Sequence, residues 1–250
     1  MTGQGARYAV YFVPAAESEL YRFGSSVLGY DCYRNEEIPL PDQFGLDSNA
    51  WRKLTEEPRR YGFHATLKAP FRLAPSCTET QLVGAFRSFA GLGQSIARVE
   101  TEIRMLSDFA AIVPYETSAA LETLANQCTT IFDAFRAPMS AQERARRGAS
   151  GLSPSQLQHL DRWGYPYVFT DYRFHMTLAA KIPVEHRDQV LDALRTAYRQ
   201  ACRDQPLILD RISLLTQDNE HARFRMLCQA ALKGGRETAS LTQAPYGGAR

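Results

Sequence analysis

The chain has 250 residues, of which 44% are hydrophobic and 22% charged, and its formal net charge is +2. This composition is typical of a soluble globular protein, and the length suits one large domain or two lobes. The mild charge does not favour a non-specific nucleic-acid binder, which needs a stronger basic field. No apolar run approaches a membrane span and Met1–Val13 shows no signal-peptide pattern, so we expect no membrane partner.

The first half of the chain alternates between strand-like and helix-like patterns. In chain order they predict a strand at 8–13, a helix from about Pro14 to Leu28, a long excursion over 29–60 with a short helix near Trp51, a strand at 62–71, a helix over 82–90, and strands at 97–105 and 108–114. An amphipathic helix over 121–135 follows. It could serve the second half as the 14–28 helix serves the first.

An insertion at 137–171 contains two unusual runs, Arg144-Ala145-Arg146-Arg147 and Trp163-Gly164-Tyr165-Pro166-Tyr167. The basic run is interpreted as a solvated helix face or as a phosphate contact, and the aromatic run as a cleft cover or as packing between lobes. After the insertion, the patterns predict a strand at 172–182, a helix over 190–201, and strands at 207–215 and 223–230. The tail at 233–250, rich in small and polar residues, is expected to be disordered.

One pattern, Phe-His-x-Thr-Leu, occurs at 63–67 and again at 174–178. Each copy lies in an apolar, strand-like run that is followed by a helix and further strands. The repeat indicates an internal duplication. We expect a single bilobal domain over 1–232, with motif lobes at about 29–115 and 137–232 and with terminal and linking elements exchanged between them. A lone histidine in a strand is usually structural, but two in equivalent places indicate two halves of one site.

Side chains alternate between the two faces of a strand. On regular strands, the polar members of both copies and their neighbours share an open face: His64, Thr66, Lys68, Arg173, His175, Thr177 and Lys181. The apolar members face the core. The cations suit phosphate binding, although a β-bulge would turn Lys68 or Lys181 away. Tyr11 and Tyr61 could contact a base or a sugar, or could pack in the core or at its rim.

The paired His-x-Thr motifs resemble those of the two-histidine (2H) phosphoesterase superfamily, which includes RNA 2',3'-cyclic phosphodiesterases, also called 2'-5' RNA ligase-like proteins. The stretches 57–68 and 163–167 resemble a bacterial branch of that superfamily associated with phosphonate-metabolism genes. The resemblance implies a bilobal, duplicated α+β fold in which two antiparallel sheets face a central cleft and helices lie outside. Pseudo-twofold symmetry would then bring His64 and His175 to opposite sides of one phosphodiester.

The implied activity is the opening of a cyclic phosphate on a small ribose-linked or nucleotide substrate, without a metal or cofactor. One neutral imidazole would activate water while the other, protonated, would protonate the departing ribose oxygen. An unperturbed pKa near 6.5 suits both tasks. Thr66 and Thr177 would donate hydrogen bonds to the non-bridging oxygens. The residues leave open which histidine is the acid, and whether water or a hydroxyl attacks.

Two other functions fit the same residues. One is an RNA 2',3'-cyclic phosphodiesterase, which would bind an RNA end but no DNA, and the other is a non-catalytic nucleotide or phosphosugar binder. A metal centre is disfavoured because the motifs bring no carboxylate at ligand spacing, and three histidines are interpreted as bystanders: His159, His186 and His221.

The five cysteines are scattered and form no C-x-x-C pair, which favours a cytoplasmic location. We expect a monomer.

Overall fold

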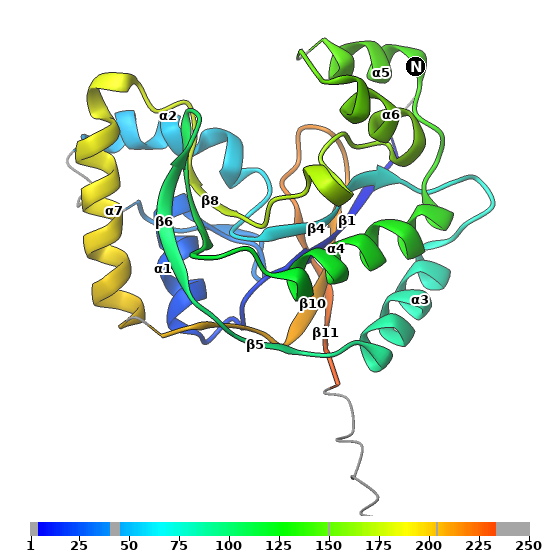
Figure 1. Cartoon of the computed structure of the whole chain (residues 1–250), viewed down its shortest axis with the longest axis horizontal. Coiled ribbons are helices and arrows are strands. Elements are labelled where there is room, and N and C mark those ends of the chain that lie inside the picture. The colour runs from blue at the N-terminus through cyan, green and yellow to red at the C-terminus, as the bar shows by residue number, and fades with distance from the viewer. Residues whose placement is uncertain (1–4, 41–45, 150, 204, 234–250) are drawn as a thin grey trace, which may run out of the picture.

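The computed structural model describes residues 5–40, 46–149, 151–203 and 205–233. It has a mixed α+β structure in which the strands pair antiparallel and helices pack outside them, which confirms the predicted fold class (Figure 1). The tail expected to be disordered lies outside the described residues from 234 onward. Within the described part of the chain, no helix is both long and apolar enough to cross a membrane.

The main sheet has seven strands in the order β11-β10-β1-β4-β8-β7-β6. Their bounds are β1 (Arg7–Phe12), β4 (Ala65–Arg72), β6 (Thr101–Leu106), β7 (Phe109–Pro114), β8 (Met176–Ala179), β10 (Arg211–Gln217) and β11 (Arg225–Ala231). Two smaller sheets pair β2 (Tyr30–Asp31) with β3 (Glu36–Glu37), and β5 (Ile96–Val99) with β9 (Leu207–Leu209).

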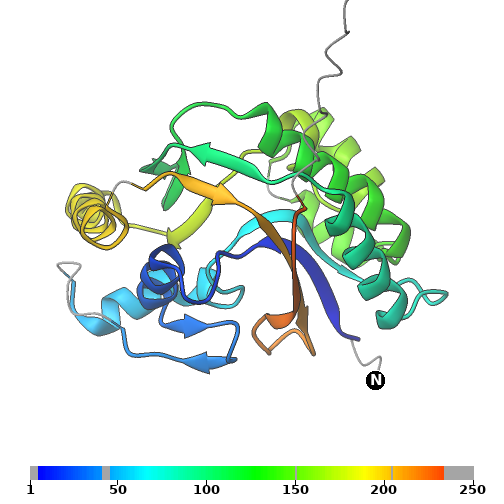
Figure 2. The ribbon, with the colours of Figure 1, turned by 90° about the horizontal axis from the view of Figure 1, so that it is seen from below.

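Seven α-helices and three short 3-10 helices surround these strands in the described residues. The α-helices are α1 (Glu19–Leu28), α2 (Ser48–Arg59), α3 (Glu79–Leu92), α4 (Ala119–Phe132), α5 (Ala141–Gly148), α6 (Pro154–Trp163) and α7 (Arg187–Cys202). The 3-10 helices are η1 (Asp133–Phe135), η2 (Phe169–Asp171) and η3 (Val184–His186). Figures 1 and 2 show α7 beside β6 on one side of the molecule and α3 and α4 on the other.

The motif strands β4 and β8 lie next to each other and join the two halves of the sheet. Their one recorded register pair is Ala65 with Met176. The hairpin β6–β7, from the first half of the sequence, extends the sheet beyond β8, and the hairpin β10–β11, from the second half, pairs with β1. The two hairpins are therefore exchanged between the halves.

The helices follow the same exchange. Helix α4 packs on β4, whereas α1 packs on β8. Each of these two helices therefore packs on the motif strand of the other half, so the 121–135 helix and the 14–28 helix hold corresponding places. The apolar members of both motifs are buried as predicted, and Phe63 and Phe174 are 0% and 6% exposed in a core that runs through both halves.

Some predicted boundaries differ from the structure because local caps and backbone turns limit the elements. Helix α1 begins at Glu19 and not near Pro14, since the Ser18 hydroxyl accepts a hydrogen bond from the backbone N–H of Tyr21. The strand predicted at 172–182 is only Met176–Ala179, preceded by η2 and followed by Lys181 at φ 55°. Consequently both histidines lie one residue before their strands, which begin at Ala65 and Met176.

Candidate active site

The two motif histidines are held by the same bond. In each, Nδ1 lies 2.8 Å from a backbone carbonyl two residues earlier, that of Gly62 for His64 and that of Arg173 for His175. A carbonyl oxygen only accepts hydrogen bonds, so Nδ1 carries the proton and donates it in both rings. In the neutral rings this tautomer leaves Nε2 as the basic nitrogen. The repeat is thus a repeat of geometry as well as of sequence.

The sheet register brings the two motifs together. Because Ala65 pairs with Met176 in an antiparallel arrangement, His64 comes opposite Thr177 and Thr66 comes opposite His175. The Thr66 hydroxyl is also 3.2 Å from Nε2 of His64, and Tyr172 donates a hydrogen bond of 2.9 Å to the Thr66 carbonyl. The register thus sets each histidine across from the threonine of the other copy.

His64 is enclosed by aromatic rings. The Tyr11 ring stacks on it with centroids 3.9 Å apart and an interplanar angle of 26°, and the Tyr61 ring lies 6.0 Å away. Burial lowers the pKa of His64 to about 4, against the opposing effect of the hydrogen bond to Gly62 and with a smaller contribution from the positive charge of His175. That coupling places the two imidazoles within electrostatic reach of one another.

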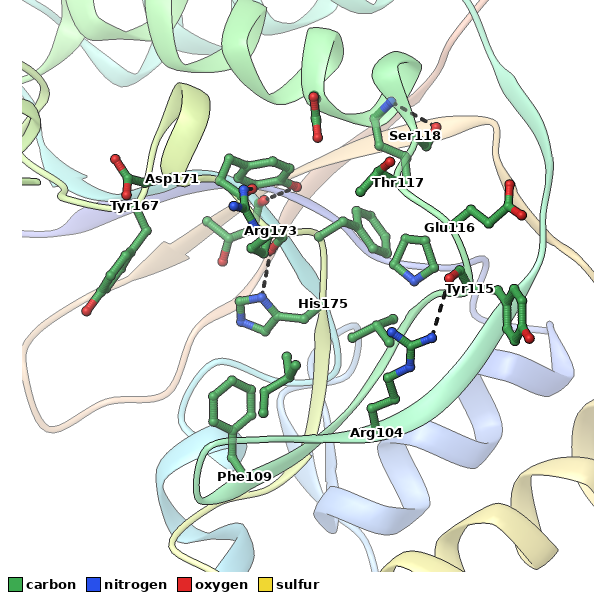
Figure 3. Close-up of a pocket in the computed structure, with 18 of the residues that line it drawn as sticks. Arg104, Phe109, Tyr115, Glu116, Thr117, Ser118, Tyr167, Asp171, Arg173 and His175 are labelled. Atoms are coloured by element: carbon green, nitrogen blue, oxygen red, sulfur yellow. Dashed lines mark hydrogen bonds between the residues drawn. The ribbon is translucent and has the colours of Figure 1, made fainter. Parts of the chain in front are cut away.

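His175 lies at the wall of an open cavity of about 740 Å³, which Thr66 also lines (Figure 3). Its ring is 5.5 Å from that of Phe109, and the neighbouring Arg173, an exposed residue, lines the same cavity. Burial also lowers the pKa of His175, against the opposing effect of the bond to the Arg173 carbonyl. Tyr165 and Tyr167 line the same cavity, so the aromatic run of the insertion reaches the site.

Lys68, predicted on the histidine face, lies on the opposite side of the sheet. Tyr11 pairs with Thr66 but Val10 pairs with Lys68, so one extra residue bulges out of β4 between the two motif positions. The Lys68 side chain is 3% exposed, and its Nζ donates to Asp133 at 2.8 Å and to the Thr129 carbonyl at 3.2 Å. The bulge considered from the sequence is present, and it turns Lys68 toward α4.

Of the other residues predicted to contact substrate, some lie near the histidines and one does not. Lys181 lies beyond the end of β8 and forms an exposed ion pair with Glu57 at 3.1 Å, so the structure does not bring it to the histidines. Arg173 lines the cavity beside His175, although its guanidinium donates to the carbonyls of Thr170 and Tyr172. Tyr11 is buried against His64, and Tyr61 stacks on Phe224 with centroids 5.4 Å apart.

A second cavity, of about 630 Å³, adjoins the first, and Tyr165 and Tyr167 line both. Its cationic wall consists of Arg7, Arg60, Arg72, Arg146 and Arg147, of which only the last two, in the basic run, were considered from the sequence for contact with phosphate. Two signals were available: Arg7 shares a strand face with Tyr11, and the basic run supplies the last two arginines. His221, interpreted from the sequence as a bystander, also lines this cavity. No group of three or more His, Cys, Asp or Glu within the described ranges could hold a metal ion.

The fold and site define a mixed α+β protein with two His-x-Thr motifs meeting at one sheet junction. A family model described as "Protein of unknown function (DUF1045)" matches residues 66–225, which is well over half of the chain. The protein therefore belongs to this family.

Two curated relatives carry the name "Ribose 1,5-bisphosphate phosphokinase PhnN". The protein from Janthinobacterium sp. (strain Marseille) is 35% identical over 238 residues, covering 94% of this chain and 52% of that protein. The protein from Laribacter hongkongensis (strain HLHK9) is 34% identical over 180 residues, covering 70% of this chain and 40% of that protein. The chain spans about half the length, or less, of these relatives.

Similar solved structures include "Crystal structure of phosphoesterase", at 12% identity and a TM-score of 0.40, covering 91% of this chain and 98% of that one. "Crystal structure of E.coli LigT complexed with NADP+" matches at 13% identity and a TM-score of 0.40, covering 92% and 99%. At this distance these similarities do not bear on the activity.

Proposed function

We propose that the protein is a 2H-type phosphodiesterase that opens a cyclic phosphate on a small ribose-linked substrate. The observation that carries the proposal is the matched geometry of the two motifs. Both imidazoles are fixed through Nδ1, and each comes opposite the threonine of the other copy. Such a pair can remove a proton on one side of a phosphorus atom and deliver one on the other side.

The roles of the two histidines follow from their surroundings. Burial under Tyr11 and the charge of a protonated His175 together lower the pKa of His64 to about 4, whereas His64 is not among the causes that shift the pKa of His175. When the pair holds a single proton at Nε2, that proton is therefore on His175. We infer that His64 is the general base and that His175 is the general acid. The anionic phosphate of a bound substrate would stabilise the protonated His175.

The reaction then balances. Nε2 of His64 takes a proton from water as the water oxygen bonds to phosphorus, and the bond from phosphorus to one ribose oxygen breaks. His175 gives its Nε2 proton to that oxygen, which leaves a phosphomonoester and a free hydroxyl. Thr66 and Thr177 donate hydrogen bonds to the non-bridging oxygens as negative charge develops on them. Proton exchange with solvent restores both rings.

A ribose-linked substrate is supported by the relatives. Both are named for a kinase of ribose 1,5-bisphosphate, a ribose that carries phosphate groups. The 250 residues of this chain contain no G-x-x-x-x-G-K-[ST] segment, the usual cradle for nucleotide phosphates in P-loop kinases. The function of the part shared with these longer proteins is thus better explained by the paired histidines than by a kinase site. We infer that this part acts on a ribosyl phosphate ester in phosphonate metabolism.

A second candidate is a phosphodiesterase for RNA ends that carry a 2',3'-cyclic phosphate. The favouring observation is the ring-rich wall of the cavity beside His175, where unstacked bases could lie on Phe109, Tyr115, Tyr165 or Tyr167. The same cavity would also suit a protein that binds a nucleotide without turning it over.

The test is turnover followed by phosphorus NMR, with nucleoside 2',3'-cyclic phosphates, a cyclic-phosphate-ended oligonucleotide and phosphoribosyl 1,2-cyclic phosphate. We expect ring opening that persists in EDTA and falls at least about 1000-fold in both His64→Ala and His175→Ala. His186→Ala, a histidine in η3, is the control. Full activity in either motif variant would rule out the mechanism, and tight binding of unchanged ligand would favour the non-catalytic alternative.

A further inference from the structure

The second cavity is notable for its charge. Five arginines line it, together with His221, whereas its wall contains one acidic residue, Glu220. The arginines come from four separate elements or their ends: Arg7 from β1, Arg60 from the end of α2, Arg72 from β4, and Arg146 and Arg147 from α5. The fold thus gathers cations that are far apart in the sequence around one hollow.

Like charges face each other at this site. Arg7 and Arg72 are directly opposite in the pairing of β1 with β4, an arrangement that costs stability in the absence of an anion. Burial lowers the pKa of the Arg7 guanidinium, and the charges of Arg72 and Arg147 act in the same direction, against opposing effects of Tyr61 and Tyr11. Arg7 donates to the neutral Gln217 amide at 2.7 Å and lies over the Phe224 ring, so no recorded contact within the described part of the chain neutralises it.

Only part of the charge is compensated by the protein. Glu143 accepts from Arg147 at 2.7 Å and from Arg72 at 3.2 Å, which fixes α5 over the end of β4. Among the described residues, neither Arg7 nor Arg146 has a recorded carboxylate partner. Multiple guanidinium groups with few acidic partners form a good site for a phosphate dianion, which accepts several charge-assisted hydrogen bonds.

The cavity is connected to the motif histidines through tyrosines. The Tyr61 ring lines the arginine cavity and lies 6.0 Å from the imidazole of His64. Tyr165 lines both cavities. Arg7 and Tyr11 share one face of β1, and Tyr11 stacks on His64. A small molecule could therefore place one phosphate between the histidines and another among the arginines.

We propose that this cavity binds a second, non-reacting phosphate of the substrate, so the substrate is a small cyclic phosphate ester that also carries a phosphomonoester. The inference rests on the proposed function and specifies its substrate class. The phosphodiester backbone of RNA could supply an anion of the same kind. We favour the monoester because its second charge suits a wall of five arginines.

The binding test uses ribose 5-phosphate and ribose as probes in titration calorimetry. We expect ribose 5-phosphate to bind and ribose not to bind, with affinity reduced at least about tenfold in Arg146→Gln and in Arg7→Gln. Arg144→Gln is the matched control, since Arg144 belongs to the same basic run but forms an exposed pair with Asp161 outside the cavity. Equal loss in Arg144→Gln would show a diffuse charge effect and overturn the proposal.

Turnover separates this proposal from the proposed function. Ribose 1,2-cyclic phosphate is compared with and without a 5-phosphate, and we expect kcat/KM at least about tenfold higher with it, an advantage that Arg146→Gln removes. If neither is opened but ribose 5-phosphate binds as expected, the catalytic proposal fails and the phosphate subsite stands. If kcat/KM is the same with and without the 5-phosphate, the proposed phosphate subsite is wrong and the proposed phosphodiesterase activity still stands. An Arg146-dependent preference for a cyclic-phosphate-ended oligonucleotide would replace the monoester by an RNA backbone.

Discussion

The phenol ring of Tyr11 lies almost parallel to the imidazole of His64, with centroids 3.9 Å apart. Tyr11 is 1% exposed, so it excludes water from one face of the histidine while the bond to Gly62 fixes the plane of the ring. Tyr11 is therefore a positioning residue in the proposed mechanism. Together with the bond to Gly62 it holds the orientation of the base, and it contributes to the burial that lowers the pKa of His64.

Replacing Tyr11 by leucine should lower kcat about 10- to 100-fold, because a loosened base attacks from a poorer geometry. Water would also reach His64, so its pKa should rise and the acid limb of the rate profile should move toward neutrality. Tyr11→Phe keeps the ring and serves as the control. A rate loss in Tyr11→Leu with an unmoved acid limb would indicate general damage to the fold, which thermal melting can detect.

The pH dependence of kcat/KM should be a bell displaced to the acid side of neutrality. Activity falls at low pH as His64 gains a proton near its pKa of about 4, and falls at high pH as His175 loses the proton that it must donate. Since the pKa of His175 is lowered from 6.5, the upper limb should begin below 6.5. The limbs belong to the coupled pair. An optimum at pH 8 or above would contradict the assignment of base and acid.

Thr66→Val and Thr177→Val preserve side-chain shape and remove one hydroxyl each. If both hydroxyls stabilise the charged oxygens of the transition state, each variant should lower kcat about 100-fold with little change in KM. Thr129→Val, which removes a buried hydroxyl on α4 away from the site, controls for the loss of a hydroxyl as such. An unchanged kcat in both motif variants would remove the threonines from the mechanism.

Lys68 should matter for stability and not for phosphate binding. Burial lowers the pKa of its ammonium, against the effect of Asp133, and the pair is isolated from water. Asp133→Asn would leave a buried charge without its carboxylate and should cost about 3–5 kcal/mol. Lys68→Met should cost less, since Asp133 keeps its bonds from Arg136 and Arg162, and it should retain kcat/KM. Urea unfolding and steady-state rates together check both expectations.

The sequence predicted the parts of the site that depend on short-range pattern. Alternation along a strand placed the apolar members of both motifs in the core, and their burial confirms this. The prediction that Lys68 shares the histidine face was wrong, because the extra residue at a β-bulge shifts the alternation of side chains between the two faces. A single sequence does not indicate reliably where a bulge occurs. For Lys181 the expected strand ends too early, at Ala179.

What the sequence could not supply depends on long-range pairing. Nothing near Arg7 indicates that it lies opposite Arg72 or beside the basic run of α5. Likewise, the order of elements suggested two halves that exchange terminal and linking elements, but it did not show that the hairpins β6–β7 and β10–β11 are among the exchanged elements. Contacts between residues far apart in the chain follow from the assembled sheet, so the cationic cavity emerges only once the sheet is built.

The exchange of hairpins has a consequence for how the chain reaches its native state. Strand β1 pairs with a hairpin that is synthesised much later, since Arg7 bonds to Gln217, 210 positions further on. Until that distant hairpin is made, one edge of β1 is unpaired and the ring of Tyr11 lacks its contact with Phe224. Such non-local pairing is typical of slow folding, so this edge of β1 stays open to pairing with other chains until the hairpin β10–β11 has been synthesised.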